Sequence, residues 1–399
     1  MARIASPSRF LWAYVITVSL AALSCGLSAV VLWRAHELSS YRDDVALQQR
    51  QHALLGLATF QNFYEYKLSL VAARRSPVLA LGSSRIMQLR EELFVDGFTN
   101  AGGAMNSAEQ GRRFLEALPA DYHPQLLMLG VDFWWFRREW SDPGDDPRYR
   151  DPSQLSPARL RHPYLWLADP RMGIRRIVRL VVSGNIGSTL TSQASVGVQA
   201  MVSASGFRPD GSYQYGDHYF GTAAEPDVRF GISLGRIDRQ DTAFGPGTDP
   251  DPASLSAIDD VLRWAAARHV RVAMFLPPVA PPVRRAMIAR PDAFGYVVAL
   301  TRALEHTARA SNVEFYDFLW REAPEAADPC EYVDGIHGGD VVFGRMLLAM
   351  AAGSMLAQTV DRAEVRHAID VYRGHTVTPL DGVRYARPEA DFLRLGCVK

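Results

Sequence analysis

The sequence predicts an α/β protein with a parallel sheet covered by helices, held on a single membrane-spanning helix. Two observations lead to this fold class: short apolar runs alternate with stretches of helical spacing, and one uncharged run near the N-terminus is far longer than a strand. The short runs occupy residues 78–81, 125–129, 270–276 and 313–316, and the helical stretches occupy residues 85–94, 255–268, 292–311 and 341–356. Strands that alternate with helices of this length are typical of βαβ units, in which helices cover both faces of a parallel sheet.

The long N-terminal run covers residues 10–33 and contains no charged residue. Its 24 positions exceed the roughly 20 that a helix needs to cross the hydrocarbon core of a bilayer. Arg3 and Arg9 precede the run and no acidic residue does, so the positive-inside rule places residues 1–9 in the cytoplasm, although Arg34 reduces the asymmetry. We therefore expect a transmembrane signal anchor, with the rest of the chain outside the cytoplasm.

Two other interpretations of this run are open. A cleaved signal peptide has an apolar region of only about 7–15 residues and a cleavage site between small residues, whereas this run is longer and ends in Val-Val-Leu-Trp-Arg. Lipidation at Cys25 is the second alternative, but the apolar run continues well past that residue. Both features favour the signal anchor.

The composition excludes several classes of protein. The 43 basic residues balance 43 acidic ones, so the chain lacks the positive charge expected of a nucleic-acid binder. Three cysteines are too few for a disulfide scaffold or a cysteine-rich metal site, and the histidines show no metal-binding spacing. Outside the cytoplasm Cys330 and Cys397 either pair, which would tie the C-terminal tail to the loop before Asp334, or remain independent thiols.

The exported part divides into three segments, the second of which contains an insertion. We expect a helical stalk over residues 34–76, which carries mixed charges on a helical pattern, and a main domain over residues 77–373. The alternation of strands and helices stops over about residues 137–252, a stretch too long for a plain loop. We interpret this stretch as an insertion or lid subdomain placed after a strand end. Residues 374–399 form a C-terminal tail.

The first candidate for chemistry is Gly82-Ser83-Ser84-Arg85, directly after the first apolar run. A serine at a tight turn from strand to helix is exposed at the carboxyl edge of a sheet, beside backbone amides. The same residues also suit ordinary turn and N-cap chemistry.

A serine nucleophile needs a base within hydrogen-bond reach, and Asp334-Gly335-Ile336-His337 supplies a histidine with a carboxylate three residues before it. The alternative for this pair is a surface turn with a capping Asp.

Two further stretches contain glycine or a polar residue at the end of a strand. Residues 100–104 (Asn-Ala-Gly-Gly-Ala) follow Gly97-Phe98-Thr99, and their glycines would let a backbone amide approach a developing oxyanion closely. Gly130-Val131-Asp132 ends the second apolar run.

Taken in this order, the four stretches resemble the blocks of the SGNH (GDSL-type) hydrolase superfamily over residues 77–132 and 256–355. The resemblance implies a three-layer α/β sandwich with a parallel sheet. It also implies that Ser84 is the nucleophile, that Asp334 and His337 complete a catalytic triad, and that the amide of Ser84 with Gly102 or Gly103 stabilises the oxyanion. No metal and no cofactor are implied.

One position departs from the family pattern. Asp132 stands where the family has an Asn that donates a hydrogen bond to the oxyanion, and an ionised carboxylate only accepts. Asp132 is therefore protonated, or binds a substrate hydroxyl, or leaves the oxyanion hole without that arm. Arg85 has two interpretations: it neutralises Asp132 in a salt bridge, or it holds an acidic group of the substrate.

With its anchor and insertion, the chain looks most similar to the extracytoplasmic acyl-transfer proteins of this superfamily, such as those of alginate acetylation and of teichoic-acid D-alanine transfer. The resemblance implies a single-pass inner-membrane protein with its catalytic domain in the periplasm or extracytoplasmic space. It would take an acyl group, expected to be acetyl, from a membrane-bound O-acyltransferase onto Ser84 and pass it to a hydroxyl of a cell-surface polysaccharide.

Two other functions are compatible with the same residues. An anchored esterase or deacetylase would use the same triad with water as acceptor, depending on how well the insertion excludes water. A non-catalytic SGNH-like module would bind polysaccharide or act as a scaffold, and Asp132 in place of Asn is the feature that favours it. The presence of Ser84, Asp334 and His337 together favours an enzyme.

Overall fold

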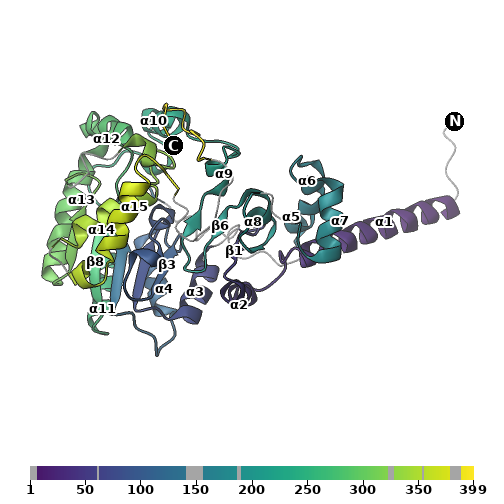
Figure 1. The fold of residues 1–399 in the computed structure, drawn as a ribbon, viewed down its shortest axis with the longest axis horizontal. Helices are drawn as coiled ribbons and strands as arrows, with labels where there is room; N and C mark the ends of the chain where they lie inside the picture. Colours follow the sequence, from purple (N-terminus) through teal and green to yellow (C-terminus); the bar gives the residue numbers. More distant parts are fainter. Residues whose placement is uncertain are drawn as a thin grey trace.

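A computed structural model describes residues 7–60, 63–140, 156–186, 190–321, 328–352, 355–377 and 388–399. Figure 1 shows a long N-terminal helix, α1 (Pro7–Arg34), that projects from a body in which helices surround a sheet. Helix α1 reaches a mean hydropathy of 2.3 and is mostly exposed, so it is long and apolar enough to cross a membrane.

The body is organised around a five-stranded parallel sheet in the order β3-β2-β4-β8-β9. Its strands are β2 (Val78–Gly82), β3 (Phe98–Gly102), β4 (Leu126–Gly130), β8 (Arg271–Leu276) and β9 (Glu314–Asp317). Every residue of β2, β3 and β4 is buried, as expected where helices cover both faces of a sheet. The predicted α/β class with a parallel sheet is confirmed.

Helices cover the sheet on both faces. Those that link successive strands from β3 to β9 are α4 (Ala108–Glu116), α11 (Pro252–Ala266), α12 (Pro281–Ile288) and α13 (Pro291–Ala310). Right-handed crossovers place them on one face, where α11 contacts both α4 and α13. On the other face α14 (Asp340–Met350) packs on α15 (Arg362–Val371), and α15 contacts the 3₁₀ turn η2 (Glu91–Leu93).

One expectation for the region after β2 is wrong. The stretch 85–94 forms two 3₁₀ turns, η1 (Ser84–Ile86) and η2, instead of one helix. Residues 85–90 are all buried, so their apolar spacing does not mark one face of an amphipathic helix. Strand β3 lies outside the four runs because its buried Thr99 and Asn100 interrupt any apolar run, and it ends at Gly102, within the stretch 100–104 that was expected at a strand end.

A second, small sheet joins the stalk to the insertion. Its order is β5-β1-β6-β7, and strand β1 comes from the stalk, whereas the other three strands come from the insertion. The elements of this region are α2 (Tyr41–Gln51), β1 (Leu54–Leu55), α3 (Phe63–Arg74), β5 (Ser195–Val196), α8 (Val198–Ser203), β6 (Gly206–Phe207) and β7 (Tyr213–Gln214). The segment expected to be a stalk contains α2 and α3, and through β1 it is also part of a folded unit.

The rest of the insertion divides between two places. Helices α5 (Pro157–Leu160), α6 (His162–Ala168) and α7 (Gly173–Ser183) all contact α1 and lie beside it in Figure 1. The elements that follow β7 are α9 (Gly216–Tyr219), the 3₁₀ turn η6 (Val228–Phe230), α10 (Gly231–Arg239) and the 3₁₀ turn η7 (Thr242–Phe244), and α10 packs on α12.

The C-terminal tail returns to the main domain. A disulfide joins Cys330, in the 3₁₀ turn η8 (Pro329–Glu331), to Cys397, so the pairing that the sequence left open is present. Lys399 reinforces this contact, because its Nζ donates to the carbonyl oxygen of Cys330 at 2.8 Å.

Candidate active site

Ser84, His337 and Asp334 form one chain of hydrogen bonds. The Oγ of Ser84 lies 2.9 Å from Nε2 of His337, and Nδ1 of His337 lies 2.8 Å from Oδ2 of Asp334. An ionised carboxylate only accepts hydrogen bonds, so Nδ1 carries the imidazole proton and Nε2 accepts from the Ser84 hydroxyl. This is the arrangement in which a histidine acts as the general base for a serine nucleophile.

The turn after β2 places Ser84 at the carboxyl edge of the sheet. Ser83 caps the 3₁₀ turn η1, and its Oγ accepts from the amide of Arg85 at 3.1 Å. Gly82 is required at the end of the strand, because a Cβ there would lie 2.8 Å from the carbonyl oxygen of Gly130. Ser84 itself is half-buried and remains accessible to a substrate.

The loop from Asp334 to His337 curls back on itself. The Oδ1 of Asp334 accepts from the amides of Ile336 and His337, both at 2.8 Å, and the amide of Val333 donates to the carbonyl oxygen of His337 at 2.9 Å. Burial acts to raise the pKa of Asp334, but the charge of His337 and these hydrogen bonds lower the pKa to about 2. Asp334 is therefore ionised at any physiological pH and orients the imidazole.

The insertion supports this loop through Asp227. Its Oδ2 accepts from the amide of Gly335 at 3.0 Å and from Oγ of Ser233 at 2.6 Å. Gly335 packs so closely on Ser233 that a Cβ at residue 335 would lie 2.3 Å from the Ser233 side chain. Sequence reasoning did not find Asp227 or Ser233, because no short motif connects them to residues about a hundred positions away.

The glycines expected to stabilise an oxyanion already have other acceptors. The amide of Gly102 donates to Oδ1 of Asn100 at 2.6 Å, and the amide of Gly103 donates to the carbonyl oxygen of Gly82 at 2.9 Å. The amide of Ser84, by contrast, donates to none of the residues that the structure describes. The Ser84 amide is therefore the backbone donor best placed to meet an oxyanion at this serine.

Asn100 stabilises the turn that carries Ser84. Its Nδ2 donates to the carbonyl oxygens of Ile86 at 2.9 Å and Leu89 at 2.8 Å. Because its Oδ1 also holds Gly102, one buried amide links the loop after β2 to the end of β3. The role of this asparagine is to hold the backbone of the turn that carries Ser84.

Arg85, the residue after Ser84, forms an ion pair with Asp132. Nη1 of Arg85 donates to Oδ1 of Asp132 at 2.9 Å, and the remaining donors of Arg85 bind the carbonyl oxygens of Ile336, Pro277 and Pro278. Burial raises the pKa of Asp132, and the charge of Arg85 opposes that rise. Of the interpretations open for these residues, the structure contains the salt bridge.

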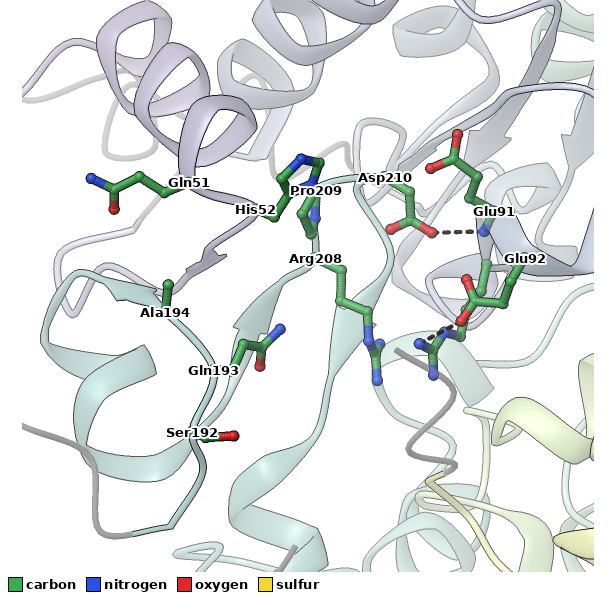
Figure 2. A pocket seen from close by; sticks show the side chains of 11 residues that line it. Gln51, His52, Glu91, Glu92, Ser192, Gln193, Ala194, Arg208, Pro209 and Asp210 are labelled. Carbon is green, nitrogen blue, oxygen red and sulfur yellow. Dashed lines mark hydrogen bonds and ion pairs between the residues drawn. The ribbon is translucent and has the colours of Figure 1, made fainter. Parts of the chain in front are cut away.

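A separate polar pocket of about 420 Å³ lies next to η2 (Figure 2). Arg90, Glu92, Arg208 and Asp210 belong to its lining, and Nη2 of Arg90 is 2.6 Å from Oε1 of Glu92. Its lining includes no residue of the triad. Among the described residues, no three His, Cys, Asp or Glu side chains gather as a metal site.

No family model, curated protein or solved structure matches this chain. The function therefore rests on the chemistry that the geometry of Ser84, His337 and Asp334 supports.

Proposed function

We propose that this protein is a membrane-anchored, SGNH-type acyltransferase that carries an acyl group on Ser84 and passes it to a hydroxyl of a cell-surface polysaccharide. The observation that carries the proposal is the hydrogen-bonded chain from Ser84 Oγ through His337 to Asp334, at 2.9 and 2.8 Å. A structural serine has no need of an imidazole that is itself oriented by a carboxylate.

The first half-reaction loads the serine. Nε2 of His337 takes the hydroxyl proton as Oγ of Ser84 attacks the acyl carbonyl, and the amide of Ser84 donates to the oxyanion that develops. The bond from the acyl carbon to the leaving group then breaks, and the leaving group departs with the proton from His337. The product is an ester between the acyl group and Ser84.

The second half-reaction transfers the acyl group from Ser84 to the acceptor. A sugar hydroxyl gives its proton to Nε2 of His337 and attacks the ester carbonyl, and the bond to Ser84 Oγ breaks as the proton returns to that oxygen. Asp334 stays ionised throughout and stabilises the imidazolium in both halves. Its pKa of about 2 supports this role.

Helix α1 supports the proposed location and the proposed donor. Its length and apolar composition suit a single-pass anchor in the inner membrane, with the domain of Ser84 on the periplasmic side. An anchor keeps Ser84 near a membrane-bound O-acyltransferase, which would raise the effective concentration of the acyl donor.

The test uses the full-length protein in detergent micelles with an activated acetyl ester. Mass spectrometry follows acetylation of the peptide that contains Ser84, while free acetate is measured with and without an oligosaccharide acceptor. Ser84→Ala is compared with Ser311→Ala, a matched control that removes an exposed hydroxyl after α13 and leaves the turn that carries Ser84 unchanged.

We expect acetyl-Ser84 in the wild type and in Ser311→Ala, slow release to water, and faster loss when the oligosaccharide is present. Rapid release of acetate with no effect of the acceptor would identify an esterase instead. If wild type and Ser84→Ala are equally unmodified, the protein is a non-catalytic module and the proposal is wrong.

A further inference from the structure

We propose that α6 and α7, with the short α5 before them, form a hairpin that is embedded in the outer leaflet of the membrane beside α1. This basic hairpin, residues 156–186, would give the protein a second contact with lipid. The inference rests on the proposed membrane anchoring of α1 and is independent of any chemistry at Ser84.

The basic hairpin packs against the C-terminal half of α1 (Figure 1). The hydroxyl of Tyr164 in α6 donates to the carbonyl oxygen of Ser24 at 3.1 Å, and Nε and Nη2 of Arg34 donate to the carbonyl oxygens of Val181 and Val182 at 2.7 and 3.0 Å. Leu32 of α1 is fully buried in the small apolar cluster that these helices share. The position of the hairpin along α1 is therefore defined at two levels, Ser24 and Arg34.

The level of Ser24 is inside the hydrocarbon core. At 1.5 Å per residue, Ser24 lies about 15 Å along the axis before Arg34, and a hydrocarbon core is about 30 Å thick. If the core begins instead at Phe10, the first residue of the uncharged run, its outer boundary lies near residue 30 and Ser24 is still about 9 Å below it. A helix in contact with Ser24 therefore reaches into the outer leaflet wherever α1 crosses.

The outward face of the basic hairpin is apolar. Its exposed side chains include Tyr164, Leu165, Leu167, Ile174, Val178 and Val182. On α7 the last three are four residues apart and so form one continuous stripe, while Ile177 and Leu180 face inward. Water would solvate this stripe poorly, whereas acyl chains would cover it.

The charge of the basic hairpin complements a lipid surface. Residues 156–186 contain six arginines, at positions 159, 161, 171, 175, 176 and 179, and one acidic residue, Asp169. Arg175 and Arg179 are exposed and each follows a residue of the apolar stripe by one position. An apolar face bordered by arginines is typical of helices that lie at the boundary between acyl chains and anionic headgroups.

The experiment measures depth in the bilayer with spin labels on the full-length protein in nanodiscs of phosphatidylcholine and phosphatidylglycerol at 3:1. Cys25→Ser removes the free thiol, and single cysteines then replace Leu165 or Val178 in the basic hairpin. Leu20 of α1 is the control for the anchor. Val371 of α15 is the matched control for exposure, because it is 51% exposed and Val178 is 53% exposed.

We expect labels at residues 165, 178 and 20 to collide readily with oxygen and to be protected from a water-soluble nickel chelate, whereas the label at residue 371 shows the reverse. If residues 165 and 178 behave like residue 371 while residue 20 is protected, the anchor stands and the embedded hairpin is wrong. If residue 20 is also open to nickel, the anchor itself fails and the hairpin proposal fails with it.

Discussion

Arg85 and Asp132 form an ion pair, with Nη1 2.9 Å from Oδ1, in which each side chain is only 1% exposed. The pair joins the turn after β2, which carries the candidate nucleophile, to the loop after β4. Asp132 therefore faces an arginine and is not open to a substrate hydroxyl. The acidic residue at this position therefore belongs to the scaffold of the site.

Removing one partner of this pair should be costly. We expect Asp132→Asn and Arg85→Met each to lower the free energy of unfolding by about 3–5 kcal/mol, because each leaves a buried charge without its partner. The double variant should lose less than the sum of the two, since neither charge remains. Chemical denaturation of the four proteins measures this coupling, and strictly additive losses would show that the pair does not interact.

Asp334→Asn should remove most of the acylation rate while leaving the fold intact. An asparagine can still accept from the amides of Ile336 and His337, but its NH₂ group would face Nδ1 of His337. That would force the proton onto Nε2, the nitrogen that must accept from Ser84. We expect the rate of acylation to fall by about 10³–10⁴-fold. A loss below tenfold in single-turnover assays would argue against this orientation of the imidazole.

Asp227 should act as a positioning residue. Asp227→Ala removes the acceptor for Gly335 and Ser233, so the loop that carries His337 loses its support from the insertion. We expect kcat to fall by about 10–100-fold with KM little changed, because a small displacement of a catalytic base strongly lowers the rate of the chemical step. Asp227→Asn keeps an acceptor oxygen and should restore part of kcat. A change in KM alone would instead place Asp227 in contact with the substrate.

Stability should depend on pH through Asp44 of α2. Burial raises the pKa of this carboxyl to about 7, against about 3.9 for an exposed aspartate. Between these two pKa values the folded state keeps a proton on Asp44 that the unfolded state has lost. The contribution of protonated Asp44 to the free energy of unfolding is therefore fully present below about pH 4, and it is lost as the pH rises through 7. The free energy of unfolding should fall by about 4 kcal/mol over this range, because each pKa unit corresponds to about 1.4 kcal/mol.

The corresponding variant is Asp44→Asn. We expect it to be more stable than the wild type at pH 8 and to show a flatter dependence of the unfolding free energy between pH 4 and 7. Asp43→Asn is the control, because that neighbouring side chain is exposed. Equal pH profiles for Asp44→Asn and the wild type would contradict the assignment.

Much of the central fold could be predicted from the sequence. The apolar runs at 78–81, 125–129 and 270–276 correspond to β2, β4 and β8, because buried parallel strands are rich in apolar residues, and the stretch 313–316 corresponds to the half-buried β9. Strand β3 could not be found in this way, since Thr99 and Asn100 are buried for the hydrogen bonds they make. The 3₁₀ turns after β2 were also missed. Residues 85–90 are buried on every side, so the spacing of their apolar residues does not distinguish a 3₁₀ turn from an α-helix.

The sequence by itself determined the features that depend on local chemistry. These are the apolar length of α1, the alternation of strands and helices, and the presence of a serine after one strand and an Asp-x-x-His near the end of the chain.

Only the tertiary structure decided which distant residues meet. It placed Ser84 against His337 across 253 positions, paired Arg85 with Asp132, and joined Asp227 to the loop of Gly335. The physical reason is that a parallel sheet gathers the ends of its strands at one edge, whatever their separation along the chain. Side-chain contacts at that edge depend on packing that no local pattern records.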